Sequence, residues 1–121
     1  MTRALGIVLL LPVLAFAGDA AKGRQIVLSR ADGNCLLCHA VPGADRPAGN
    51  LGPSLAGVGS RFGPDELRSR LVDASRFNPK SVMPPYGRVE GLRAVAPQYR
   101  GKPLLTDQEI EDAVAFLSTL K

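Results

Sequence analysis

Apolar residues recur at helical spacing in three parts of the chain. In residues 20–29, Gly23, Ile26 and Val27 fall on one face of a helix. Asp19 stands where its side chain can cap the first turn of this helix. No part of the chain alternates between apolar and polar residues over the length of a strand. The pattern therefore predicts an all-α protein.

A second helix is predicted from Pro64 onward. Proline followed by Asp65 and Glu66 is typical of a first helical turn, where a missing N–H is tolerated and acids face the positive helix end. The residues expected to form its buried face are Leu67, Leu71 and Val72.

The last predicted helix follows Thr106 and runs to the C-terminus. Thr106 and Glu109 have the spacing of a capping box, in which each side chain binds the backbone of the other residue. The apolar positions that then repeat at helical spacing are Ile110, Ala113, Val114, Leu117 and Leu120.

The remaining chain is rich in residues that interrupt regular structure. It contains 13 glycines and 10 prolines among 121 residues, which predicts long irregular connections between the helices. It has no tryptophan and few other aromatic residues, so a domain of this size has little with which to fill a core. Something other than side chains is expected to fill its centre.

The N-terminus has the pattern of a secretory signal peptide. An apolar run over residues 5–14 follows Arg3 and precedes Ala15-Phe16-Ala17, a small-x-small cleavage sequence. The run is too short to span a membrane, for which about 20 apolar residues are needed. We therefore expect residues 1–17 to be removed on export to the periplasm, which leaves a single domain over residues 18–121.

Charge is unevenly distributed in the expected mature chain. The segment from Arg61 to Lys102 carries nine basic and four acidic residues, whereas the last helix is acidic. A basic middle segment could face an acidic protein partner, and it could equally be an ordinary solvated surface. No lysine or arginine run with interleaved aromatic residues indicates nucleic-acid binding.

Both cysteines and the only histidine of the chain lie within five positions. Cys35, Cys38 and His39 stand at i, i+3 and i+4, so in a helical turn their side chains emerge on one face. C-x-x-C-H is the attachment sequence of c-type haem, in which two thiols bond the macrocycle and the imidazole binds the iron. A thioredoxin-like pair would need a βαβ pattern, and zinc would need about four ligands. A plain disulfide would leave the adjacent histidine unexplained.

A second axial ligand is predicted by elimination. Once Met1 leaves with the signal peptide, Met83 is the only methionine, and it lies in a loop stiffened by Pro79, Pro84 and Pro85. The alternative is a methionine that fills a gap in the core, in which case the iron would bind gas or peroxide. Ligation by His39 and Met83 predicts a raised reduction potential, because a neutral thioether stabilises ferrous iron.

Residues 50–63 carry weaker signals. Gly57-x-Gly59 lacks the full spacing and the preceding strand of a dinucleotide site. A backbone carbonyl near Pro53 is expected to accept the Nδ1–H of His39 and fix the orientation of its ring. Arg61 is a candidate to neutralise a haem propionate, and its alternative is an ordinary surface arginine.

These motifs together resemble class I c-type cytochromes over essentially the whole mature chain. The matching stretches are "GDAAKGRQIV", "CLLCH", "LGPSLAGVGSR" and the terminal "EIEDAVAFLSTL". The resemblance implies a small fold of about three helices and long loops around one covalently attached haem. In that fold Gly23 marks the close crossing of the first and last helices, with Val27 and Phe116 beside it. The link over residues 28–34 is longer than in the commonest members of the class.

Within this class, "NPKSVMPPYG" followed by "YRGKPLLTDQEIEDAVAFLSTLK" is similar to the SoxX family of monohaem subunits. The resemblance implies a heterodimer with a SoxA-like haem subunit, in which the complex joins thiosulfate to a cysteine of the SoxYZ carrier. It also implies that this subunit passes single electrons to a soluble cytochrome c. The chain has no thiol left after haem attachment and no free histidine, so we do not expect it to perform the sulfur chemistry alone.

A function of a different class stays open from the sequence. The chain could be a free-standing periplasmic electron shuttle for another oxidase or reductase. A permanent partner requires an apolar contact patch, whereas a shuttle requires a small, charged and salt-sensitive docking face.

Overall fold

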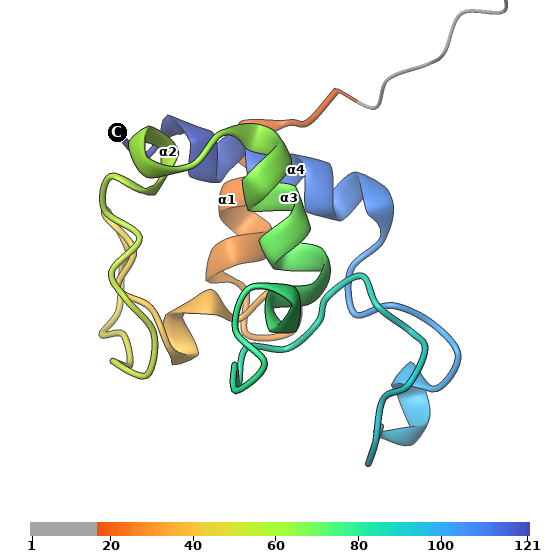
Figure 1. Cartoon of the computed structure of the whole chain (residues 1–121). Coiled ribbons are helices and arrows are strands. Elements are labelled where there is room, and N and C mark those ends of the chain that lie inside the picture. The colour runs from red at the N-terminus through yellow and green to blue at the C-terminus, as the bar shows by residue number, and fades with distance from the viewer. Residues whose placement is uncertain (1–16) are drawn as a thin grey trace, which may run out of the picture.

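A computed structural model of the chain describes residues 17–121, and within them it contains helices and irregular segments but no strand. Figure 1 shows how these elements are arranged. The four α-helices are α1 (Ala20–Leu28), α2 (Val58–Arg61), α3 (Pro64–Asp73) and α4 (Asp107–Thr119). Three single turns of 3₁₀-helix are η1 (Cys35–Leu37), η2 (Ala74–Arg76) and η3 (Pro97–Tyr99).

The three predicted helices are α1, α3 and α4, so the all-α fold class is confirmed. Asp19 caps α1 by accepting hydrogen bonds from the amides of Ala21 and Lys22, at 2.9 and 3.1 Å. Thr106 and Glu109 form the capping box of α4. The helix α4 ends at Thr119 rather than at the chain terminus.

Sequence analysis missed α2 and the 3₁₀ turns. Each is a single turn of three or four residues, which is too short to show a helical period. The predicted signal peptide, residues 1–17, lies outside the described residues except for Ala17. None of the helices in the described part of the chain is long and apolar enough to cross a membrane.

The helices α1 and α4 cross in close contact at Gly23, as the resemblance implied. A Cβ atom at Gly23 would lie 1.8 Å from the carbonyl oxygen of Asp112 and 2.9 Å from Cβ of Phe116, so no larger residue fits there. The buried carboxylate of Asp112 also accepts a 2.8 Å hydrogen bond from the backbone amide of Asp19. The two ends of the described chain are therefore joined through both packing and a hydrogen bond.

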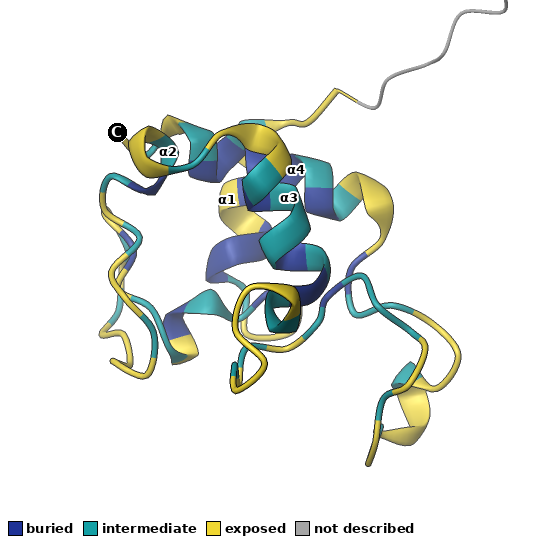
Figure 2. Ribbon diagram, viewed as in Figure 1, coloured by how far each residue is buried: buried dark blue, intermediate teal, exposed yellow. Residues whose placement is uncertain are grey.

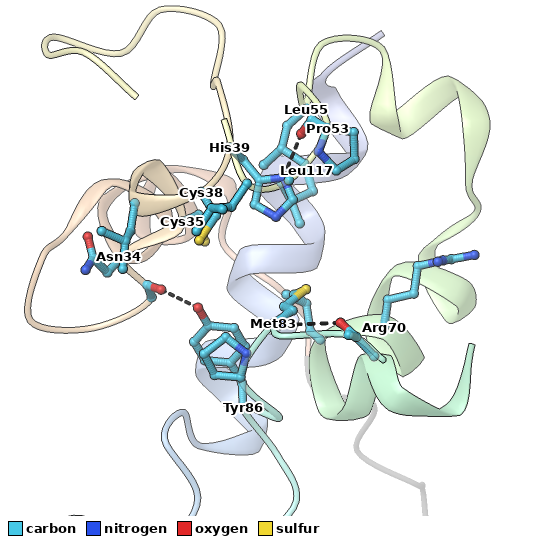
Figure 3. Close-up of a pocket in the computed structure, with 18 of the residues that line it drawn as sticks. Asn34, Cys35, Cys38, His39, Pro53, Leu55, Arg70, Met83, Tyr86 and Leu117 are labelled. Carbon is cyan, nitrogen blue, oxygen red and sulfur yellow. Dashed lines mark hydrogen bonds between the residues drawn. The ribbon is translucent and has the colours of Figure 1, made fainter. Parts of the chain in front are cut away.

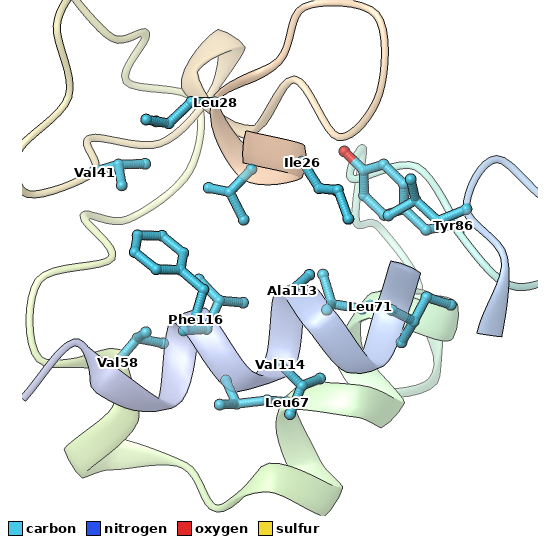
Figure 4. Packing of buried hydrophobic residues seen from close by; sticks show 14 of the residues in the cluster. Ile26, Leu28, Val41, Val58, Leu67, Leu71, Tyr86, Ala113, Val114 and Phe116 are labelled. Atoms are coloured by element: carbon cyan, nitrogen blue, oxygen red, sulfur yellow. The ribbon is translucent and has the colours of Figure 1, made fainter. Parts of the chain in front are cut away.

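The hydrophobic core lies between α1, α3 and α4 (Figure 4). Its best-buried side chains are Val27 and Ile110, and Phe116 packs beside them. The helix α3 contributes Leu67 and Leu71, but Val72, which the sequence placed on the buried face, is only half-buried. Val72 packs at the edge of the core, where Gly87 lies beside its side chain and donates a hydrogen bond to its carbonyl.

The long connections lie to one side of this core and are mostly exposed (Figure 2). Residues 29–57 join α1 to α2, and residues 74–106 join α3 to α4. Both connections contribute residues to one large cavity, described below. The helical core thus acts as the back wall of a site whose other walls are loops.

Candidate functional site

The C-x-x-C-H sequence forms one tight turn at the edge of the core. The amides of Cys38 and His39 both donate to the carbonyl of Cys35, at 3.1 and 2.9 Å. Leu36 is buried in the core, which fixes the orientation of the turn. Both cysteines and His39 line the same cavity, and Figure 3 shows their side chains together.

The two cysteines are not joined in a disulfide. Burial, with a small contribution from the nearby Cys38, raises the pKa of the Cys35 thiol to about 11. A thiol in such a site stays protonated at neutral pH. Cys35 therefore stands in the folded chain as a neutral, apolar-like group at the wall of the cavity.

The ring of His39 is fixed by the loop that follows it. Its Nδ1 lies 2.6 Å from the carbonyl oxygen of Pro53, and a carbonyl can only accept, so Nδ1 carries the proton. In the tautomer with its proton on Nδ1, the imidazole has its lone pair on Nε2. A Cβ atom at Gly52 would lie only 2.3 Å from Cε1 of the ring, so the loop backbone packs directly on the imidazole.

Backbone hydrogen bonds hold this loop to the attachment turn. The amides of Gly49, Gly52 and Leu55 donate to the carbonyls of residues 36, 38 and 40, each at 2.8 Å. Because the donors and acceptors are all backbone groups, their positions depend little on side-chain rotamers. The structure therefore brings together Cys35, Cys38, His39 and the Pro53 carbonyl, as the sequence proposed.

Arg61 lies at the end of α2 and also lines the cavity. Its guanidinium donates to the carbonyls of Ala56 and Ser54, at 2.7 and 3.2 Å. These bonds hold the charge at the cavity wall and steady the loop between His39 and α2. The side chain remains exposed enough to meet a further anion.

Met83 reaches the same cavity from the connection between α3 and α4. The residue is partly buried against the core, and its amide donates a 3.2 Å hydrogen bond to Oγ of Ser81. Figure 3 shows the thioether of Met83 on a segment separate from the one that carries His39. The structure thus provides the cavity with one nitrogen and one sulfur donor from two different elements.

Tyr86 is a site residue that sequence analysis missed. Its buried hydroxyl donates a 2.5 Å hydrogen bond to the carbonyl of Gly33, two residues before Cys35. Its backbone amide donates to Leu71 of α3, and its carbonyl accepts from Leu105. Tyr86 therefore ties the loop of Met83 to the attachment turn, to α3 and to the segment before α4.

A second missed feature stands beside the cavity on α3. The guanidinium of Arg70 lies between the rings of Phe62 and Phe77, 4.3 and 4.2 Å from their centroids. Glu66, one turn earlier, accepts its hydrogen bonds. This stacking holds the half-exposed Phe77 against α3. Neither contact nor the Tyr86 bond leaves a sequence signal, because the partners are not linked by a motif.

The cavity fits a haem group. Its volume is about 900 Å³, large for a domain of this size, and it is lined on several sides by apolar side chains such as Leu55, Leu71 and Leu117. It presents two thiols, a lone pair on Nε2 of His39 and the thioether of Met83. Two thiols for covalent attachment and a nitrogen–sulfur donor pair for low-spin iron are the donor set that haem c requires.

Comparisons with known proteins agree with this reading of the site. The family model for cytochrome c matches residues 20–121. Cytochrome c-555 of Prosthecochloris aestuarii is 31% identical over 82% of this chain and 85% of its own length. An uncharacterized lipoprotein of Aquifex aeolicus is also 31% identical, over 83% of this chain, which spans about half of that protein.

Two solved structures resemble the fold. The crystal structure of SoxXA from P. pantotrophus superposes with a TM-score of 0.77 at 34% identity, over 87% of this chain and 83% of that one. The c-type cytochrome SorU from Sinorhizobium meliloti superposes with a TM-score of 0.53 at 26% identity, over 84% and 88%.

Proposed function

Because this chain belongs to the cytochrome c family and is a class I cytochrome with one covalently bound haem c, we propose that it is the electron-accepting subunit of a SoxAX-type complex. The complex would oxidatively join thiosulfate to a cysteine of a SoxYZ-type carrier protein. This subunit would take up the released electrons one at a time and pass them to a soluble cytochrome c.

The proposed roles of the site residues follow from their chemistry. Cys35 and Cys38 form thioethers with the haem, and His39 binds the iron through Nε2 while Pro53 holds Nδ1–H. Met83 supplies the second axial ligand from the opposite loop. When bound, the haem supplies one-electron exchange between ferrous and ferric iron.

Arg61 is proposed to neutralise a haem propionate. Its two hydrogen bonds to backbone carbonyls place a fixed positive charge on the cavity wall close to the histidine loop. The guanidinium would offset the negative charge of a propionate, and a charge-assisted hydrogen bond between them would be stronger than a neutral one.

The observation that carries the proposed partner is the similarity to SoxXA over nearly the whole chain. The residues of the chain suit a subunit that transfers electrons and leaves the sulfur chemistry to its partner. After haem attachment no thiol remains, and the only histidine is occupied. We further propose that residues 1–17 are a cleaved signal peptide and that the complex acts in the periplasm.

The test is to purify the exported protein from its host at low ionic strength and record oxidised and reduced spectra. We expect a low-spin haem c spectrum with a thioether–iron band, and a SoxA-type cytochrome that co-purifies in equal amount. A purified complex should couple thiosulfate to the carrier cysteine, as followed by the mass of the carrier, while the isolated subunit should not.

A free-standing electron shuttle is the second candidate, and the similarity to cytochrome c-555 and to SorU favours it. In that case the same spectrum would come from a lone monomer. Absence of covalent haem would contradict both candidates.

A further inference from the structure

Residues 88–104 form an excursion from the body of the protein, which we call the arm. It begins directly after Gly87, whose amide donates to Val72 of α3, and ends at Leu105, whose amide lies 3.1 Å from the carbonyl oxygen of Tyr86. The two ends of the arm are therefore adjacent at its base. Figure 1 shows the segment projecting away from the helices on the side of α3 and α4.

The arm adds little to the stability of the domain. None of its 17 residues is buried (Figure 2), and its backbone hydrogen bonds, such as Tyr99 to Ala96 and Lys102 to Tyr99, stay within it. Its one ion pair with the body is between Arg88 and Asp73, 2.9 Å apart at the base. Loops of more than about 12–15 residues without substantial secondary structure of their own are commonly functional.

The arm has the residue types of a docking element. It carries four basic residues and a single acid, Glu90, and the basic side chains of Arg93, Arg100 and Lys102 are exposed. The residues Leu92, Val95 and Tyr99 add half-exposed apolar surface. Arginine and tyrosine are enriched among the residues that dominate binding energy at protein interfaces.

The arm borders the haem cavity at two points, its base and the η3 turn. Tyr99 and Leu104 line the same cavity as Met83 and Pro84. A protein bound along the arm would therefore lie next to the side of the cavity where Met83 stands. This position suits a partner that exchanges electrons with the site.

We propose that the arm is a docking element for an acidic protein surface, namely that of the SoxA-type haem subunit. This inference rests on the function proposed above. The excess of positive charge steers an acidic partner, and the apolar and tyrosine side chains supply contact area once the partner is bound. An interface needs about 800 Å² on each partner, so the arm would share it with neighbouring loops.

The experiment uses the holoprotein and the SoxA-type haem subunit, each purified separately. In one variant Arg93 and Arg100 are both changed to Glu, and in a second variant Leu92 and Val95 are both changed to Ser; none of these four residues lines the cavity. The matched control changes Lys22 and Arg24 of α1, both exposed, to Glu. Dissociation constants are measured by calorimetry at low and moderate salt, and haem spectra verify that each variant is folded.

We expect both arm variants to bind at least about tenfold more weakly, with spectra unchanged, and the control to stay within about threefold of the wild type. The Arg93→Glu, Arg100→Glu variant should also lose most of the salt dependence. Wild-type affinity in both arm variants would overturn the arm proposal alone. Failure of the wild type to bind the partner at all would overturn the proposed complex together with the arm.

The same variants test whether the arm binds something other than the SoxA-type subunit. Self-association of the wild-type holoprotein that the arm variants abolish would assign the arm to a second copy of the chain. Binding of the wild type to anionic lipid vesicles at physiological salt, lost in the arm variants, would assign it to a membrane surface. Either result, with unchanged partner affinity, would replace the proposal.

Discussion

On one side of the cavity, residues 35–61, backbone atoms hold nearly every functional group in place, whereas on the other side, residues 77–86, a few side chains do so. On the histidine side, three backbone hydrogen bonds and the Pro53 carbonyl fix the loop around His39. On the methionine side, Met83 itself is held by the side chain of Ser81, and the end of its loop is held at Tyr86 by two backbone hydrogen bonds and by the tyrosine hydroxyl.

The difference indicates how the two sides divide their tasks. If His39 and Met83 bind the iron as proposed, His39, which is held by backbone atoms on the attachment turn, is expected to stay in place in both oxidation states. A ligand held by one serine, two following prolines and one tyrosine hydroxyl responds more readily to a change of a single side chain. Substitutions on the histidine side should therefore affect how well the haem is retained. Substitutions on the methionine side should affect the haem spectrum and the reduction potential.

The largest effect is expected from removing the attachment thiols. Changing Cys35 and Cys38 together to Ser should abolish covalent haem, because the hydroxyl does not replace the thioether bonds. Haem staining after denaturing electrophoresis measures this directly. The matched variant on the other side, Met83→Leu, should keep the stain but lose the thioether–iron band, with a potential lower by on the order of 0.1 V. Stained protein from the double variant would contradict the assignment.

A large effect is also expected at Gly52. A methyl group there would lie 2.3 Å from the His39 ring, so Gly52→Ala must displace the ring or the loop. We expect the holoprotein to lose about 1–3 kcal/mol of unfolding free energy in denaturant titrations and its haem spectrum to change.

Gly63→Ala is the control for Gly52→Ala, because a Cβ atom at Gly63 would meet nothing within 4 Å and its φ of −72° suits alanine. Gly63 is the N-cap residue of α3. Its change to alanine should alter the free energy of unfolding by less than about 1 kcal/mol and leave the haem spectrum unaltered. Equal spectra for both variants would show that the Gly52 backbone does not position the imidazole.

A smaller effect is expected at Tyr86. Tyr86→Phe leaves the carbonyl of Gly33 without its buried donor, at a cost of about 1–2 kcal/mol. Because this bond ties the Met83 loop to the attachment turn, the thioether–iron band should weaken at a lower pH than in the wild type. Thr119→Val is the control, because it removes another hydroxyl that donates to a backbone carbonyl but does not line the cavity, and it should leave the pH titration of the band unchanged. A stability loss without any change in the band would make Tyr86 a purely structural residue.

The smallest effect is expected at Asp73, which ends α3 behind the methionine side. Hydrogen bonds from Ser75, and then the charge of Arg88, lower the pKa of this carboxyl below its ordinary value. A lowered pKa in the folded state means that the carboxylate stabilises the fold at neutral pH and that this contribution is lost as the pH falls below about 4.

Asp73→Asn should therefore be slightly less stable than the wild type at pH 7, and the difference should be smaller at pH 3. Urea titrations of both proteins at the two pH values measure the difference. A stability difference that is the same at both pH values would mean that the charge of Asp73 does not contribute.

The sequence predicted those parts of the protein whose determinants are close together along the chain. Caps at Asp19 and Thr106, the period of the long helices and the C-x-x-C-H spacing are local patterns, and the structure has α1, α3 and α4 where they were expected. The Pro53 carbonyl was expected because a histidine that binds a metal through one ring nitrogen commonly donates from the other to a backbone carbonyl.

The parts that escaped prediction depend on contacts across the fold. The hydroxyl of Tyr86 meets Gly33 across 53 positions, and Arg70 stacks on two phenylalanines that no motif connects to it. The sequence showed that residues 88–104 lie in a segment with an excess of basic residues. It could not show that they project from the helices, because charge does not determine where a segment lies in the fold.

The hydrogen bond between Asp19 and Asp112 spans 93 positions, so the first and last helices meet only after almost the whole domain is available. Closing a loop of that length costs on the order of 4 kcal/mol of chain entropy. Leu117 of α4 forms part of the cavity wall beside the attachment turn near the N-terminus. A chain whose last helix has not yet been synthesised therefore lacks a complete pocket, and the order of synthesis places assembly of the haem cavity at the end of folding rather than at its beginning.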